Sequence, residues 1–291
     1  MYGKGFVTIF CLVCMAVPAA HAKYDTRYPL VLAHGMGASA RIAGIMDYWG
    51  AIPAALEGAG AEVYISAVNG MDSTEAKALD FRNQVMEILV ISGAEKVNII
   101  GHSHGALYSR YAISNLGLAP YTASFTSIAG PHQGSAMADM IMNGIPQKYH
   151  SLVGGSLDMI YALIMGDSNP DSLANGWAVT THHMRQVFNP NTPDKEGVYY
   201  QSWAAKAKWG APSVLMQVPW LIMLGLEGAN DGLVSVESAK WGKFRGVQEG
   251  AWYSPGCDHL NIVGMLLGIT PGFHAPQFYK NIAADLKARG Y

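Results

Sequence analysis

The stretch 97–106 constrains the fold of this chain more than any other. It begins with apolar residues that predict a short buried strand, and residues 107–116, which contain neither Pro nor Gly, predict a helix. Gly101 and Gly105 allow the strand to turn directly into the helix, because a Cβ at either position would collide with neighbouring backbone. Ser103 is therefore predicted at the tip of the turn and at a helix N-terminus. Free N–H groups there favour developing negative charge, which suits a nucleophile.

The composition indicates a globular protein with a large core. The chain has 291 residues, of which 50% are hydrophobic and 14% charged, and alternating strands and helices of this length often form one domain. The net charge of −2 and the lack of a Lys/Arg block argue against binding to nucleic acid or to an anionic membrane surface. We expect a single domain over residues 23–291, and a monomer.

Residues 1–22 have the pattern of a secretory signal peptide. Lys4 supplies the charged start, residues 6–17 form an apolar run that is too short to span a bilayer comfortably, and residues 20–22 read Ala-His-Ala, a small-x-small cleavage signal. The sequence therefore predicts an extracellular protein released through the periplasm. Removal of the signal leaves Cys257 as the only cysteine, so we expect no intramolecular disulfide.

The remaining chain alternates apolar runs with helical periods, which is typical of a parallel sheet with helices on both faces. Residues 167–212, rich in Asn, Pro, Gly and aromatics, are expected to form irregular excursions around the site. The predicted strands are 28–33, 62–68, 97–100, 124–129, 220–226 and 246–253, and the predicted helices are 47–56 (with Pro53 as a kink or restart), 73–93, 107–116 and 277–289.

The alternation stops after Gly-Pro-His-Gln-Gly-Ser at residues 130–135. Residues 136–166 hold five of the 15 methionines, and flexible thioether side chains suit a surface that repacks against varied apolar partners. This segment predicts one or two short amphipathic helices that form a lid or an acyl pocket. Ordinary core helices are the alternative.

The first predicted strand ends in His-Gly-Met-Gly at residues 34–37. A glycine-rich turn at this place lets a backbone N–H point into the site. We therefore assign one oxyanion donor to the N–H of Met36 and the other to the N–H of His104. An ordinary glycine turn is the alternative.

A serine hydroxyl needs a histidine to accept its proton and a carboxylate to orient that histidine. In the order Ser, acid, His, His259 best matches a late loop after the last predicted strand. Asp231 lies in a glycine-flanked turn directly after a long apolar run. The sequence thus predicts a triad of Ser103, Asp231 and His259, with Glu227 as the weaker alternative acid.

Two further histidines flank the predicted nucleophile. His102 and His104 have no metal-ligand spacing with a third ligand, and Cys257 has no second cysteine beside it. We expect both histidines to orient loops by hydrogen bonding, and we predict no metal site.

Taken together, these motifs resemble those of the secreted bacterial true lipases of the Pseudomonas and Burkholderia type, in the α/β-hydrolase superfamily. The resemblance implies a mostly parallel central sheet flanked by helices, with a helical lid insertion. It also implies triacylglycerol hydrolysis, the triad roles of Ser103, Asp231 and His259, and oxyanion donors at Met36 and His104. The matching stretches are residues 28–36, 47–49, 101–105, 129–135, 199–203, 230–234 and 258–260.

The sequence departs from the family pattern at two sites. The family's calcium site uses an aspartate two residues after the catalytic histidine, where this chain has Asn261, and another before the acid, where residues 208–218 contain none. Glu237 stands near the place of one cysteine of the family's disulfide. We therefore expect no calcium and no other cofactor.

The sequence predicts a secreted serine carboxylic-ester hydrolase that acts through an acyl-enzyme, most simply a triacylglycerol lipase. The expected partner is a lipid or ester at an oil–water interface, and a folding chaperone stays an open possibility. The alternatives are a short-chain carboxylesterase or polyester depolymerase on the same triad, and a non-catalytic binding module of the same fold.

Overall fold

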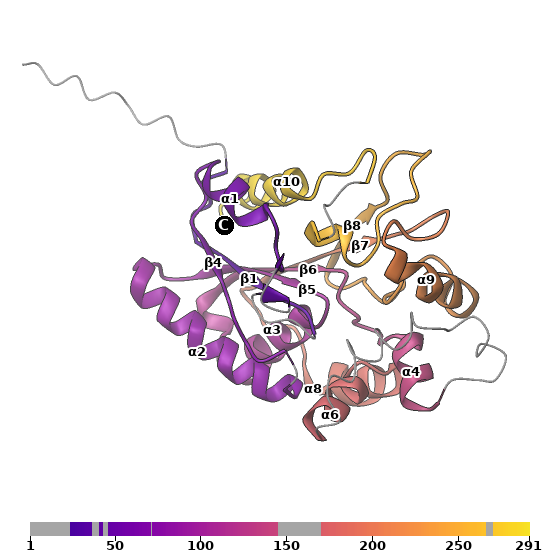
Figure 1. Cartoon of the computed structure of the whole chain (residues 1–291). Coiled ribbons are helices and arrows are strands. Elements are labelled where there is room, and N and C mark those ends of the chain that lie inside the picture. The colour runs from indigo at the N-terminus through magenta and orange to yellow at the C-terminus, as the bar shows by residue number, and fades with distance from the viewer. Residues whose placement is uncertain (1–23, 37–40, 43–45, 71, 145–169, 266–269) are drawn as a thin grey trace, which may run out of the picture.

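A parallel six-stranded sheet forms the centre of the described structure (Figure 1). The computed structural model describes residues 24–36, 41–42, 46–70, 72–144, 170–265 and 270–291. The strand order is β4-β1-β5-β6-β7-β8, and every neighbouring pair is parallel. The strands are β1 (Leu30–Ala33), β4 (Val63–Ile65), β5 (Val97–His102), β6 (Thr122–Ile128), β7 (Tyr199–Ala205) and β8 (Lys243–Gln248).

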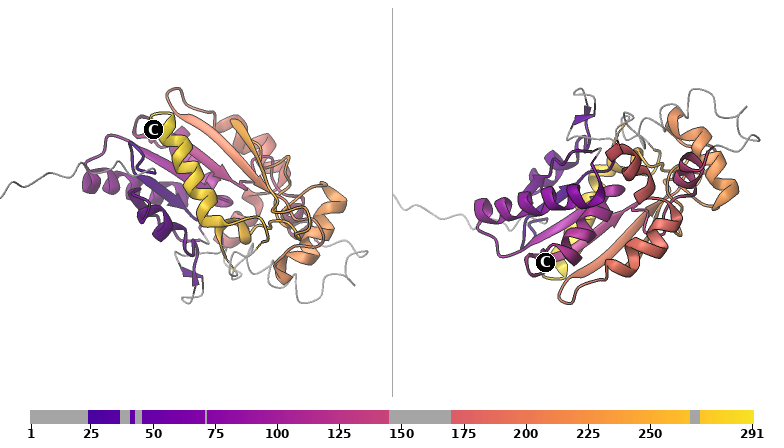
Figure 2. Two further views of the ribbon diagram at one scale, coloured as in Figure 1. Left: turned by 90° about the horizontal axis from the view of Figure 1, so that it is seen from above. Right: turned by 90° about the horizontal axis from the view of Figure 1, so that it is seen from below.

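Helices cover both faces of this sheet, as Figure 2 shows. Successive side chains of a strand point to opposite faces, so in β1 Leu30 and Leu32 join the core under α1 (Ile52–Glu57) and α10 (Ala275–Ala288). Val31 joins the core under α2 (Thr74–Ser92) and α3 (His104–Asn115) on the other face. The predicted α/β-hydrolase architecture, a parallel sheet between helical layers, is confirmed.

Local capping chemistry explains the bounds of the longer helices. Ser73 caps α2, since its Oγ accepts the N–H of Ala76, and Gly93 ends this helix in the left-handed region at φ 67°. His274 caps α10 by accepting the N–H of Gln277 at Nδ1. These helices follow the predicted ranges within a few residues.

The predicted helix over 47–56 begins later than expected. Pro53 lies in the first turn of α1, where a proline costs no hydrogen bond. The residues before it form a short antiparallel pair, β2 (Arg41–Ile42) with β3 (Met46–Asp47). Pro53 is therefore a helix start and not a kink.

The predicted strand over 220–226 is wrong, because these residues belong to helix α9 (Val214–Leu226). A continuous apolar run does not distinguish a buried strand from a helix by periodicity, and the 13-residue length of α9 is more typical of a helix. Pro219 lies inside the helix and did not break it. Strand β8 (Lys243–Gln248) begins three residues before the predicted range 246–253 and ends within it.

Strand β7 lies in the range that was expected to be irregular, and that prediction is wrong. It pairs with β6 and β8, and two of its polar side chains are buried with partners. The Gln201 amide donates to Thr126 Oγ1 over 2.9 Å, and the Ser202 hydroxyl accepts the N–H of Trp241 over 2.8 Å. Buried polar residues can be accommodated when they have hydrogen-bond partners. Because such residues lower the hydropathy of the segment, the sequence does not show it as a buried strand.

Short helices precede β6, connect β6 to β7 and follow β8, and the first of the connecting ones is α4 (Ala136–Met142). Within the predicted lid, α4 places Met137 and Met140 in the core, whereas residues 145–166 and the predicted signal 1–22 lie outside the described residues. No helix in the described part of the chain is long and apolar enough to cross a membrane. These elements are η1 (Ala119–Tyr121), α4 (Ala136–Met142), α6 (Pro170–Ala178), α7 (Thr181–His183), the π-helical η3 (Met184–Phe188), α8 (Asn189–Asn191) and η4 (Asn261–Val263).

Candidate active site

Ser103 occupies the sharp turn between β5 and α3 that the sequence predicts. Its backbone has φ 56° and ψ −128°, a conformation that a residue with a side chain rarely adopts. A Cβ on Gly101 would lie 2.8 Å from the backbone of Ala106, and one on Gly105 would overlap the carbonyl oxygen of Ala33. The two glycines thus permit the close contact of β1, β5 and α3 that holds Ser103 at the tip.

The predicted oxyanion loop after β1 lies against Ser103. A Cβ on Gly35 would be 2.9 Å from the Cβ of Ser103, so only glycine allows this approach. Tyr108 Oη donates to the carbonyl of His34 over 2.9 Å and ties the loop to α3. Met36 follows directly, half-buried, at the edge of the described residues. The structure therefore brings the segment of Met36 to the nucleophile turn.

Asp231 and His259 form a hydrogen-bonded pair. His259 Nδ1 lies 2.8 Å from Asp231 Oδ2, and both side chains are buried. The other carboxylate oxygen accepts the N–H groups of Leu233 and Val234 over 3.0 and 2.8 Å. The backbone joins the same two loops, since the N–H of His259 donates to the carbonyl of Asp231 over 2.9 Å. A carboxylate held in this way fixes the ring orientation of His259 and leaves Nε2 free.

The alternative acid, Glu227, makes a different contact. Its Oε1 accepts the N–H of Ala136 over 2.8 Å at the start of α4. The geometry therefore pairs His259 with Asp231 and leaves Glu227 to anchor α4. Between Ser103 and His259, both described, the structure gives no direct hydrogen bond, and such bonds often tighten only when substrate is bound.

A buried tyrosine connects the predicted oxyanion loop to the predicted base, His259. Tyr48 Oη accepts the N–H of Gly35 over 2.9 Å and lies 2.5 Å from His102 Nδ1. The ring of His102 in turn packs on that of His259, with centroids 4.6 Å apart. Burial lowers the pKa of His102 well below its usual value and raises that of Tyr48. The tautomer of His102 sets which of the two groups, Tyr48 Oη or His102 Nδ1, donates the proton in this contact.

The side chain of His104 forms hydrogen bonds, as the sequence predicts, but its partners lie in the first turn of helix α2 and not in a loop. Its Nε2 lies 2.8 Å from Thr74 Oγ1 and its Nδ1 lies 3.0 Å from Lys77 Nζ. Burial lowers the pKa of His104 well below its usual value, and the charge of Lys77 adds to that effect. Sequence reasoning missed Lys77, which lies in no motif, and gave Tyr48 no role although it lies in the matching stretch 47–49. The contacts of both depend on burial by distant segments.

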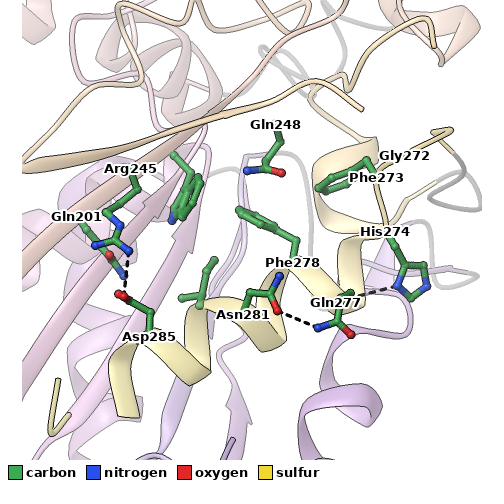
Figure 3. A pocket seen from close by; sticks show the side chains of 12 residues that line it. Gln201, Arg245, Gln248, Gly272, Phe273, His274, Gln277, Phe278, Asn281 and Asp285 are labelled. Carbon is green, nitrogen blue, oxygen red and sulfur yellow. Dashed lines mark hydrogen bonds and ion pairs between the residues drawn. The ribbon is translucent and has the colours of Figure 1, made fainter. Parts of the chain in front are cut away.

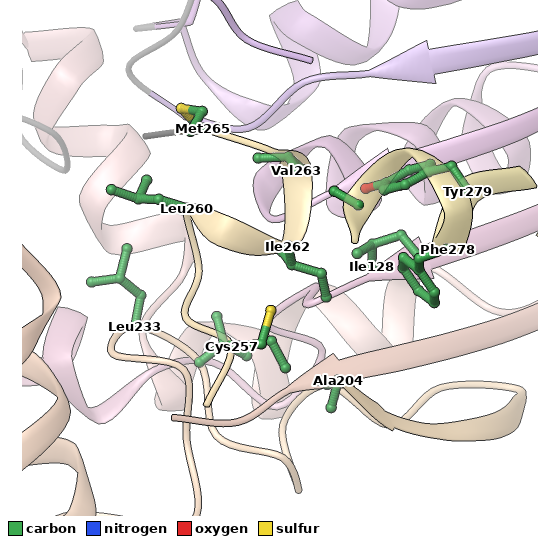
Figure 4. Close-up of a cluster of buried hydrophobic side chains, with 14 of the residues drawn as sticks. Ile128, Ala204, Leu233, Cys257, Leu260, Ile262, Val263, Met265, Phe278 and Tyr279 are labelled. Carbon is green, nitrogen blue, oxygen red and sulfur yellow. The ribbon is translucent and has the colours of Figure 1, made fainter. Parts of the chain in front are cut away.

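The loops that carry Asp231 and His259 share one apolar cluster, seen in Figure 4. Leu233 follows the acid, whereas Cys257 and Leu260 surround the base, and all three are buried against the ends of β6 and β7. Next to them the carboxylate of Asp258 accepts the N–H groups of three residues at 2.7 to 3.0 Å: Ser213, Leu260 and Asn261. Packing and backbone hydrogen bonds thus hold the loop of the base.

The described residues around His259 do not fit the oxygen ligands that calcium prefers. Asn261 is buried, and its Oδ1 accepts a hydrogen bond from Thr270 Oγ1 over 3.4 Å. No group of three or more His, Cys, Asp or Glu among the described residues could hold a metal ion. Independence from a metal cofactor stays a prediction.

A separate cavity of about 530 Å³ lies between β7, β8 and α10 (Figure 3). The ion pair of Arg245 with Asp285, 2.9 Å apart, lies in its wall, together with aromatic and amide side chains. None of the predicted triad residues lines it. This cavity is therefore distinct from the candidate site.

Known structures share this fold. The chain superposes with a TM-score of 0.69 on a metagenomic carboxyl esterase, at 19% identity over 91% of this chain and 76% of that one. The superposition on a lipase from Staphylococcus hyicus has a TM-score of 0.66 at 18% identity, over 91% of this chain and 96% of that one. Fold and site geometry together define the class: an α/β-hydrolase.

Sequence relatives narrow this class. The chain is 34% identical to a triacylglycerol lipase of Vibrio cholerae, over 98% of this chain and 97% of that protein. It is 33% identical to a triacylglycerol lipase of Burkholderia plantarii, over 61% and 51% of the two chains. The family model of palmitoyl protein thioesterase matches residues 29–188. The chain belongs to the bacterial lipases of the α/β-hydrolase type and is a carboxylic ester hydrolase.

Proposed function

We propose that the protein is a triacylglycerol lipase that acts through a triad of Ser103, His259 and Asp231. The observation that carries the proposal is the buried hydrogen bond between His259 and Asp231, with the ring of His259 packed on His102, the residue before Ser103. The names of its full-length relative in Vibrio cholerae and of other relatives support glycerides as substrates.

In the proposed reaction, Ser103 Oγ attacks the ester carbonyl while His259 Nε2 accepts its proton. Asp231, bonded to Nδ1, keeps the free lone pair on Nε2 and stabilises the imidazolium that forms. The imidazolium then protonates the leaving alcohol, and an acyl group remains on Ser103. Water, deprotonated by His259, releases the fatty acid and restores the serine.

The tetrahedral intermediates carry a negative oxygen. We assign its stabilisation to the backbone N–H groups of Met36 and His104, which follow the β1 loop and the nucleophile respectively. The contact between Gly35 and Ser103 supports this assignment, since it brings the two donor segments together.

The surface next to α4 supports a lipid substrate. Helix α9 packs on α4 and leaves large apolar side chains in solvent, among them Val214 at 74% exposure and Leu221 at 49%. Such a surface fits an oil–water interface better than bulk water.

Release of fatty acid from emulsified triolein tests the proposal. Activity on triolein that disappears in Ser103→Ala supports a lipase. Hydrolysis of only soluble short-chain esters would indicate the carboxylesterase, hydrolysis of a polyester film would indicate the depolymerase, and no turnover of any ester would indicate a binding module. A palmitoyl thioester in the same series tests the chemistry in the name of the matched family model.

We also propose that the protein is exported. The charged start, apolar run and small-residue signal of residues 1–22 support a signal peptide. N-terminal sequencing of the protein recovered from culture medium tests this, with a start at Lys23 as the expected result.

A further inference from the structure

A buried lysine lies directly behind the nucleophile turn. Lys77, in the first turn of α2, is 1% exposed. Its Nζ lies 3.0 Å from His104 Nδ1 and donates to Asn175 Oδ1 over 2.9 Å. The amine therefore links α2 to α3, which begins at the turn of Ser103, and to α6.

This position is unfavourable for a positive charge. The N-terminal turn of a helix carries a partial positive charge of its own, and both hydrogen-bond partners of Lys77 are neutral groups. Burial lowers the pKa of Lys77 to about 7, against the weaker opposing effect of Asp72. Burial of an amine costs free energy that a position on the exposed face of the helix would avoid. A buried lysine with a shifted pKa beside a candidate site is therefore a candidate for a functional role.

We propose that Lys77 is a positioning residue of the oxyanion hole: its ammonium group fixes the side chain of His104 and sets a positive charge behind the His104 N–H. The inference rests on the proposed function, in which that N–H receives the oxyanion. Lys77 itself touches neither substrate nor reacting atoms in this role.

The hydrogen-bond directions follow from the charge of Lys77. An ammonium group only donates, so Nδ1 of His104 must accept and Nε2–H must donate to Thr74 Oγ1. A neutral amine can also accept, and then both tautomers of His104 are allowed. Loss of the proton therefore removes the charge and releases the ring from a single hydrogen-bond arrangement.

The other titratable groups near Lys77 have little compensating charge. From the end of β1, His34 is held neutral by burial, and the charge of Lys77 lowers its pKa further. From α3, His104 is neutral for the same reasons. Asp72, before α2, is the acid that favours the ammonium form, and among the described side chains of α6 the one bonded to Lys77 is the neutral Asn175. Lys77 is thus the group of this set that changes charge near neutral pH.

The expected consequence is that the contribution of Lys77 to kcat decreases as the pH rises above the pKa of its amine. Since the folded-state pKa is about 7, the ammonium is present below that pH and is lost above it. Lys77→Met keeps the chain length but carries no charge. At about pH 6 we expect Lys77→Met to lower kcat on a soluble ester roughly tenfold and to leave KM nearly unchanged. This is a smaller loss than follows the removal of a group that donates a hydrogen bond directly to the oxyanion.

The test is the ratio of wild-type to Lys77→Met kcat between about pH 5 and about pH 9. Taking the ratio of the two proteins removes any pH dependence of kcat that they share. A ratio that falls toward one as pH rises through neutrality supports the inference, whereas a constant ratio, as expected for a purely structural lysine, overturns it. Lys243→Met, at the exposed start of β8, is the matched control.

Lys77→Arg keeps the test decisive if Lys77→Met does not fold. Arginine stays charged throughout this pH range, so the ratio of Lys77→Arg to wild-type kcat should rise above neutral pH, and a constant ratio overturns the inference. If wild-type protein hydrolyses no ester, or Ser103→Ala is active, the proposed function fails and the inference with it. A wild-type enzyme that depends on Ser103 but shows constant ratios contradicts the inference alone.

Discussion

The imidazole ring of His102 packs on that of His259, with centroids 4.6 Å apart and planes inclined by 42°. His102 precedes the proposed nucleophile in the chain, and its Nδ1 lies beside the hydroxyl of Tyr48. That hydroxyl also accepts the N–H of Gly35. One buried tyrosine therefore connects the oxyanion loop to the support of the proposed base.

Tyr48→Phe should lower kcat by roughly ten- to a hundredfold, since the rings stay packed but Gly35 N–H and His102 Nδ1 lose their common partner. Stability should fall by about 1–3 kcal/mol. Steady-state kinetics and denaturant unfolding check both. Tyr64→Phe, which removes an exposed hydroxyl bonded to Glu62, is the control. Equal kcat values for Tyr48→Phe and wild type would show that the hydroxyl does not position the site.

Ser103→Ala should reduce ester hydrolysis by roughly a thousandfold or more, because no nucleophile remains. The melting temperature should stay within a few degrees of wild type, since a small side chain replaces another at a half-exposed turn. Thermal unfolding and p-nitrophenyl ester turnover are the measurements. An unchanged rate in the purified variant would end the assignment of Ser103.

Asp231→Asn and Glu227→Gln form a matched pair that tests the acid. Asp231 is bonded to His259, so its loss should lower kcat by roughly a thousandfold or more. Glu227 binds the N–H of Ala136, and Gln can still accept that bond, so the second variant should keep its rate within a few fold. The reverse order of the two rates would assign the acid to Glu227.

Chelator and reductant should leave activity and melting temperature unchanged. Asn261 offers no carboxylate for calcium, Asp258 and apolar packing hold the loop of His259, and Cys257 is buried as a free thiol. Thermal unfolding with EDTA and with a reducing agent checks this. A drop of several degrees in EDTA that calcium restores would reveal ligands beyond those described.

Activity should rise steeply once substrate exceeds its solubility limit. The reason is that opening of the predicted lid exposes apolar surface, which is covered only when a lipid interface is present. Leu221→Ser with Leu224→Ser should then reduce hydrolysis of emulsions more than that of soluble esters, because both residues are exposed on α9. Val90→Ser with Ile91→Ser removes exposed apolar surface from α2 and serves as control. Smooth saturation below the solubility limit would favour an esterase with an open site.

Local signals in the sequence predicted the elements that depend on neighbours in the chain. Gly101 before Ser103, the cap at Ser73 and the glycine-flanked turn of Asp231 act within a few residues. For that reason the nucleophile turn and helix α2 agree with the prediction.

Tertiary structure alone decided the rest. The apolar run of α9 reads equally well as strand or helix until packing selects one, and β7 buries Gln201 because Thr126 of β6 satisfies it. The contacts of Tyr48 with His102 and of Lys77 with His104 join residues 54 and 27 positions apart. Burial and the pKa shifts that follow from it arise only when such distant segments exclude water together.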